Sequence, residues 1–176
     1  EGIYCQGDTI YLAKGGVHQP VMNIHKDMSL VGVCNVENVM AAIAITEGFG
    51  IPREHIIKVV KQFSAVEHRI EYVTTVNDVD YYNDSKGTNP DAAIKAIQAM
   101  KRPTVLLGGG YDKDSVYTEW IEAFDGKVKK LVLLGATREK IAADAEKCGF
   151  HDYVFADTFD EAVMMAVGFA EEGDAV

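Results

Sequence analysis

Residues 104–135 read TVLLGGGYDKDSVYTEWIEAFDGKVKKLVLLG, and this stretch decides the fold of the second part of the chain. Apolar runs predict strands at 104–107 and 130–134, and the segment between them predicts a helix at about 115–124. A strand, a helix and a second strand in this order form a β-α-β unit, whose strands lie parallel in one sheet. The stretch therefore predicts an α/β domain.

The same alternation continues on both sides of this unit. Towards the carboxyl end, Thr158-Phe159-Asp160-Glu161 has the spacing of a capping box, which opens a helix. Towards the amino end, Asn77-Asp78 is a typical hairpin turn between two apolar runs. We therefore expect a Rossmann-like, mostly parallel sheet with flanking helices. The further expected elements are a hairpin over 70–82, helices over 90–100 and 137–148, and a strand over 153–155.

Residues 1–64 follow a different pattern of short strands followed by two helices. Val36, Val39, Met40 and Ile43 have the spacing of one helix face, and a second helix can begin at Pro52. We divide the chain into residues 1–64, a hinge at 65–68 and residues 69–176. The short strands are expected at 3–5, 9–12 and 21–24, the last after a loop that contains Pro20.

Composition excludes several kinds of partner. The 176 residues include 17 basic and 27 acidic side chains, and the net charge of −10 argues against a nucleic-acid surface. No apolar stretch reaches the roughly 20 residues that a membrane helix needs, so we expect no membrane partner. The histidines lack metal-ligand spacing, and we assign no metal ligand. Three cysteines without a C-x-x-C pair indicate a reduced, cytoplasmic protein: Cys5, Cys34 and Cys148.

The densest polar cluster is NDSKGTNP at residues 83–90. It follows a predicted strand and precedes a predicted helix, and the carboxyl ends of strands are where open α/β sheets bind ligands. Asp84 could accept hydroxyls or a metal, and Lys86 could bind an anion. Alternatively, the segment is a polar loop in which Asn89 or Asp91 caps the next helix. The residues alone favour the two interpretations equally.

Three weaker patterns accompany this cluster. The run GGGYDK at 108–113 could bring Lys113 to an anion at the same edge, although a glycine-rich turn commonly has no ligand. Arg69 could clamp a phosphate or carboxylate, but pairing with Glu67 or Glu71 is the simpler interpretation. Asn35 and Asn38 share a helix face and could contact a base, or could merely cap the helix. No G-x-x-x-x-G-K-[ST] motif occurs, so this sequence contains no P-loop.

Four segments in order, VCNVEN at 33–38, EHRIE at 67–71, YNDSKGTN at 82–89 and GGYDK at 109–113, resemble the Mur ligases. The run NDSKGTN is most similar to the members that add D-glutamate during peptidoglycan synthesis. The resemblance implies that residues 1–64 are the end of a central ATPase domain and that residues 69–176 are a carboxyl-terminal ligase domain. It also implies a piece of a longer enzyme, inactive alone, whose final D-glutamate-binding segment is missing.

The resemblance further implies a reaction and roles for individual residues. ATP and Mg²⁺ would support the joining of D-glutamate to UDP-N-acetylmuramoyl-L-alanine through an acyl phosphate. Alternatives are another Mur or folylpolyglutamate-synthetase-like ligase, or a non-catalytic α/β module that binds a nucleotide. The implied contacts are adenine with Asn35 and Asn38; ribose and neighbouring phosphate with Arg69 and Asp84; the nucleotide region with His68; the transferred phosphate with the catalytic Lys86; and D-glutamate with Thr88 and Lys113.

Overall fold

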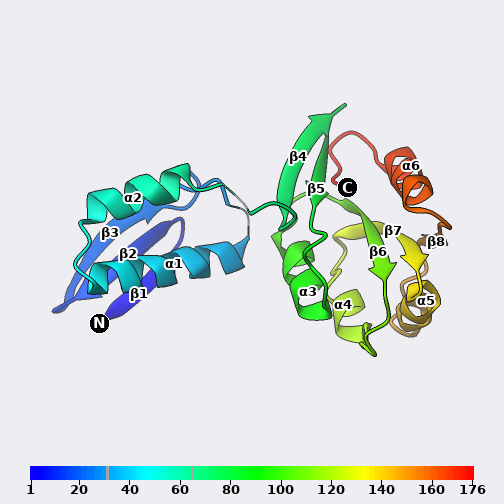
Figure 1. The fold of residues 1–176 in the computed structure, drawn as a ribbon, viewed down its shortest axis with the longest axis horizontal. Helices are drawn as coiled ribbons and strands as arrows, with labels where there is room; N and C mark the ends of the chain where they lie inside the picture. Colours follow the sequence, from blue (N-terminus) through cyan, green and yellow to red (C-terminus); the bar gives the residue numbers. More distant parts are fainter. Residues whose placement is uncertain (31, 65) are drawn as a thin grey trace. The chain divides into compact units, whose positions relative to one another are not determined.

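The computed structural model describes residues 1–30, 32–64 and 66–176 (Figure 1). The chain divides into two compact units, residues 1–66 and 67–176, and each is described by itself. Among the described residues, no helix combines the length and apolar character needed to cross a membrane.

The first unit packs two helices against an antiparallel sheet with strand order β1-β2-β3. Its core is formed by Ile10 and Met22 from the sheet together with apolar positions of both helices, among them Val39, Ile43 and Ile56. The predicted helix face is therefore confirmed. The elements are β1 Gly2–Gln6, β2 Thr9–Lys14, β3 Val17–Asn23, α1 Val33–Gly48 and α2 Arg53–Gln62.

The expected loop around Pro20 is wrong, because Pro20 lies inside β3 and pairs with Tyr11 of β2. β3 is an edge strand of the sheet, and an edge strand tolerates proline where the missing N–H would face away from its neighbour. The pairing register shifts between Ile10 and Tyr11, next to this position. Pro20 therefore lies within an edge strand of this sheet.

The second unit confirms the predicted α/β fold. β4 (Glu71–Val76) and β5 (Val79–Asn83) form an antiparallel hairpin, whereas β6 (Thr104–Gly110), β7 (Val128–Gly135) and β8 (Tyr153–Phe155) lie parallel. Asn77 and Asp78 both have positive φ, as a tight turn that follows the strand twist requires.

The last residues of the chain connect the two groups of strands. Ala175 forms parallel bridges with both Asp80 of β5 and Thr104 of β6. The Tyr82 N–H donates to the carbonyl of Val176 at 2.8 Å, and the Val105 N–H donates to that of Ala175 at 2.8 Å. Because β5 and β6 run in the same direction, their carboxyl ends meet at one edge of the sheet.

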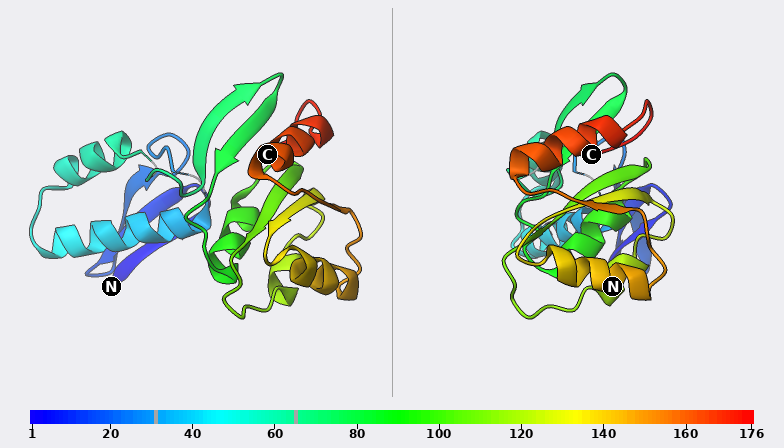
Figure 2. Two further views of the ribbon diagram at one scale, coloured as in Figure 1. Left: turned by 45° about the vertical axis from the view of Figure 1, so that its right-hand side comes forward. Right: turned by 90° about the vertical axis from the view of Figure 1, so that its right-hand side faces the viewer.

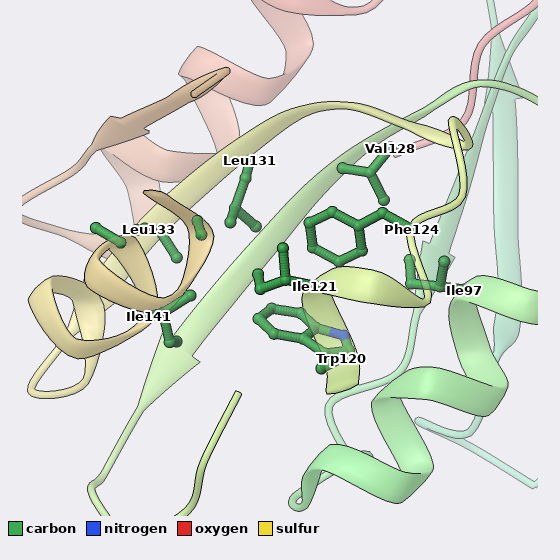
Figure 3. Packing of buried hydrophobic residues seen from close by; sticks show 10 residues of the cluster. Ile97, Trp120, Ile121, Phe124, Val128, Leu131, Leu133 and Ile141 are labelled. Atoms are coloured by element: carbon green, nitrogen blue, oxygen red, sulfur yellow. The ribbon is translucent and has the colours of Figure 1, made fainter. Parts of the chain in front are cut away.

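Helices cover both faces of this sheet, with α5 on one side and α6 on the other (Figure 2). On the α5 side, Trp120 and Phe124 pack against Leu131 and Leu133 of β7 (Figure 3). On the other side, Val132 packs with alanines of α6. The helices are α3 Pro90–Ala99, α4 Thr118–Glu122, α5 Arg138–Lys147 and α6 Phe159–Phe169. Only α4 is clearly shorter than predicted, because the residues before Thr118 form a loop held by α5.

Lys129 connects β7 to the end of the second unit. Its ammonium lies 2.6 Å from the buried Asp174 carboxylate and 3.0 Å from Glu171, and these hydrogen bonds raise the pKa of Lys129. We expect Lys129→Met to lower the free energy of unfolding by about 2 kcal/mol, because Asp174 would remain buried without its cation. Urea titrations monitored by circular dichroism measure this loss, and Lys101→Met, at an exposed position before β6, is the matched control.

The stabilisation that Lys129 contributes should depend on pH in a definite direction. A lysine whose folded-state pKa is raised contributes its full stabilisation below the unfolded-state pKa of about 10.4 and loses it as the pH rises through the folded-state value. The difference in unfolding free energy between the wild type and Lys129→Met should therefore be constant near neutrality and shrink above about pH 10.4. A difference that grows with pH would contradict the assignment.

Candidate functional site

The polar loop at 84–88 begins at the carboxyl end of β5 and leads into α3. The Asn89 side chain accepts a hydrogen bond from the Ala92 N–H at 2.9 Å, so Asn89 caps α3 and Pro90 begins it. The capping interpretation is therefore confirmed for Asn89. It leaves Asp84, Lys86 and Thr88 without a capping role.

Asp84 fastens this loop to the segment before β4. Its Oδ1 accepts a hydrogen bond from the Ile70 N–H at 2.9 Å, and its carbonyl accepts one from the Gly87 N–H at 2.7 Å. A Cβ at position 87 would overlap Asp84 Oδ2, so a larger residue there would force the Asp84 carboxylate to move. Burial raises the pKa of Asp84, while the Ile70 hydrogen bond and the charge of Arg69 partly oppose the rise. A hydroxyl donor or a cation at Oδ2 would favour the ionised form.

His68 lies against the same loop. Its carbonyl accepts from the Lys86 N–H at 2.9 Å, and its Nδ1 lies 2.8 Å from Asn83 Nδ2. Both His68 and Ile70 have positive φ, which is uncommon for residues other than glycine, and the hydrogen bonds from the loop hold this backbone in place. Arg69 lies between these two fixed residues, so its backbone position is set by the loop.

Sequence reasoning missed two features of this linkage. Asn83 holds His68 although the two are 15 residues apart, and no spacing rule connects them. Glu71, considered as a partner for Arg69, instead accepts a hydrogen bond from the His68 N–H at 2.8 Å. This contact forms where the backbone has a positive φ at residue 68, a conformation that could not be read from the residue types.

Thr88 and Lys113 meet at the edge of the sheet. Lys113 follows β6 in the loop 111–117, and its ammonium donates to the Thr88 carbonyl at 3.4 Å. Both residues are exposed, so the Thr88 hydroxyl and the Lys113 ammonium can be reached from solvent. A hydroxyl donor and an ammonium from two neighbouring residues can bind a carboxylate.

Lys86 combines a fixed backbone with an exposed side chain. Its N–H donates to His68, and its carbonyl accepts from the Thr88 N–H at 3.0 Å. Within residues 1–30, 32–64 and 66–176, no side chain forms an ion pair with its ammonium. This ammonium is therefore available to an external anion.

The structure brings six of the eight predicted residues into the second unit, around one edge of its sheet. Asn35 and Asn38 belong to the first unit, in the first turns of α1, where Asn35 is half-buried and Asn38 is exposed. Neither is the N-cap of α1, which is Gly32. Among the described residues, no three His, Cys, Asp or Glu side chains gather in an arrangement that could hold a metal ion.

The β5–α3 and β6–α4 loops lie at one edge of the sheet of an α/β domain, and they carry the exposed Lys86, Thr88 and Lys113. Residues 68–176 match the family described as "Mur ligase, glutamate ligase domain", and the chain belongs to this family. The resemblance predicted from four segments of sequence is thereby confirmed.

Individual relatives of this chain carry a more specific name than the family. The chain is 53% identical over 175 residues to UDP-N-acetylmuramoylalanine–D-glutamate ligase of Lachnospira eligens, and 46% identical over 177 residues to the ligase of the same name from Thermoanaerobacter sp.. Each comparison covers 99% of this chain but 39% of the relative, so the chain spans about two fifths of their length. The solved UDP-N-acetylmuramate-alanine ligase of Thermotoga maritima shares the fold, with a TM-score of 0.71 at 15% identity over 96% of this chain and 38% of that one.

Proposed function

We propose that the protein forms the carboxyl-terminal part of an ATP-dependent ligase that joins D-glutamate to UDP-N-acetylmuramoyl-L-alanine in peptidoglycan synthesis. The observation that carries the proposal is the 53% identity, along 99% of the chain, to a ligase named for D-glutamate. The contact between Lys113 and Thr88 supports it, because it joins the two residues assigned to the amino acid.

In this proposal the chain acts within a longer protein. Residues 1–64 would be the end of a central ATPase domain and 69–176 the carboxyl-terminal ligase domain. The hinge would be 65–68, of which residue 65 lies outside the described residues. The P-loop that a triphosphate requires is absent from this sequence and would belong to the rest of that protein. A cytoplasmic location agrees with the three unpaired cysteines.

The proposed reaction requires several anions to be held together. ATP would supply the phosphoryl group that activates the L-alanyl carboxylate, with Mg²⁺ screening the phosphates. Lys86 would lie at the transferred phosphate and stabilise the charge that develops there. Thr88 and Lys113 would hold carboxylates of D-glutamate, whose amine forms the amide as phosphate leaves.

The remaining assignments concern the nucleotide. Asp84 has the half-buried carboxylate that a ribose hydroxyl could donate to, and Arg69 is held next to it for a neighbouring phosphate. His68 would lie in the same region. Asn35 and Asn38 would contact adenine.

A ligation assay on the natural protein that contains this chain tests the proposal. With ATP, Mg²⁺ and UDP-N-acetylmuramoyl-L-alanine, we expect release of phosphate and formation of amide with D-glutamate in preference to L-glutamate, L-alanine or glycine. Strong preference for another amino acid would indicate a different Mur or folylpolyglutamate-synthetase-like ligase. Nucleotide binding without amide formation would indicate the non-catalytic module.

Lys113→Ala should chiefly weaken binding of the amino acid. Removing a carboxylate contact made in the ground state should raise the KM for D-glutamate by about 10- to 100-fold, with a smaller change in kcat. Steady-state kinetics with each substrate varied in turn measure the effect. A change confined to the KM for ATP would refute the assignment of Lys113.

A further inference from the structure

We propose that one face of α5 positions the loop that carries Lys113. Thr137 is the N-cap of α5, and Lys140 and Asp144 follow it at spacings of three and four residues, so the three lie along one side of the helix. Each of them contacts the segment from Gly110 to Tyr117. The inference rests on the proposed function only in naming the ligand, the amino-acid substrate that Lys113 would hold.

The three contacts fix the beginning, middle and end of the segment. The buried Thr137 donates its N–H to the carbonyl of Gly110 at 3.2 Å. The Lys140 ammonium lies 3.1 and 3.3 Å from the two carboxylate oxygens of Asp112. Asp144, also buried, accepts the N–H of Tyr117 at 3.0 Å.

Asp112 carries the central contact to the turn around Lys113. Its Oδ1 also accepts the Asp114 N–H at 2.9 Å, and Asp114 has a φ of 57°, so the carboxylate closes a tight turn with Lys113 at its centre. Lys140 holds this carboxylate from α5. A lysine side chain is long and flexible, and fixing its backbone limits where the ammonium can reach.

The Lys140–Asp112 pair also acts through charge. An unpaired Asp112 carboxylate would stand directly beside Lys113 and would repel an anionic substrate. Paired with Lys140, it contributes little net charge, and Lys113 remains the cation that faces Thr88. Lys140 is therefore a positioning residue. Its removal should weaken carboxylate binding in two ways, by loosening the turn around Lys113 and by leaving the Asp112 charge unpaired beside it.

The first test measures the loop in the 176-residue chain itself. In Lys140→Met we expect amide hydrogen exchange at Asp114, whose N–H is held by Asp112, to accelerate about tenfold, with exchange in β7 unchanged. Lys140→Arg should retain slow exchange, because a guanidinium at this position can still pair with the Asp112 carboxylate. Lys101→Met, which removes an ammonium from the opposite edge of the sheet, is the matched control.

The second test measures kinetics in the natural protein. Lys140→Met should raise the KM for D-glutamate about tenfold and change kcat and the KM for ATP less than about twofold. Lys140→Arg should behave like the wild type, which a merely structural loss would not explain. Wild-type exchange and a wild-type KM in Lys140→Met would overturn the proposal. If the wild type forms no amide from D-glutamate, the proposed function fails, and the exchange measurement alone decides whether α5 positions the loop.

Discussion

Lys86→Ala in the natural protein is expected to lower kcat by about 10²- to 10³-fold, the range found when a single fixed donor to a developing charge is removed. The backbone of Lys86 is held on both sides, by His68 and by Thr88, while its ammonium is exposed. In the proposed role, an ammonium on a backbone that is held in place would stabilise most strongly the charge that develops during phosphoryl transfer. The loss should therefore appear in kcat more than in either KM.

Lys95→Ala is the matched control for this prediction. Lys95 is an exposed lysine of α3, in the helix that follows the loop, and its removal should leave kcat unchanged. Circular dichroism should show both variants folded. A kcat near the wild-type value in Lys86→Ala would return Lys86 to the role of an ordinary polar residue in a surface loop.

Gly109→Ala is expected to have the largest effect on stability, lowering the free energy of unfolding of the second unit by about 3 kcal/mol or more. Gly109 has a φ of 136°, a conformation that favours glycine, and a Cβ there would overlap the carbonyl oxygen of Leu134. That oxygen belongs to the backbone of β7 and cannot rotate away. β6 and β7 would have to separate at the end that carries the Lys113 loop.

Gly110→Ala separates the steric overlap from the strain of positive φ. Gly110 has a similar φ of 132°, but a Cβ there would meet nothing within 4 Å. We expect it to cost about 1 kcal/mol, the strain alone. Urea unfolding followed by the fluorescence of Trp120, the single tryptophan, reports on this unit. Equal losses in the two variants would show that the contact with Leu134 does not matter.

Much of the fold follows from local sequence patterns. Asn77-Asp78 forms the predicted turn, and Thr158 caps α6 by accepting the Glu161 N–H. These features depend on residues close together in the chain. The predictions of a loop at Pro20 and of a longer α4 were wrong, because neighbouring elements decide both features. Pro20 lies in β3, which is at the edge of its sheet. The start of α4 is set by Asp144, which accepts the Tyr117 N–H from 27 residues away.

The candidate site was predictable in part for a different reason. Thr88 and Lys113 are 25 residues apart, yet the rule that parallel strands end at one edge brings their loops together. The side-chain pairs that hold these loops in place could not be predicted. Asn83 with His68 and Lys140 with Asp112 are pairings of common polar residues, and only the folded chain selects these partners among many.

In the proposed enzyme, Lys86, Thr88 and Lys113 form one site for the phosphate and the amino acid. A crystal structure of the natural protein with ADP and the D-glutamate-containing product tests it most directly. We expect a glutamate carboxylate within hydrogen-bond distance of both Lys113 Nζ and the Thr88 hydroxyl, with the Lys86 ammonium facing the phosphates of the nucleotide. A product whose glutamate lies away from both loops, with Lys86 in solvent, would contradict the account.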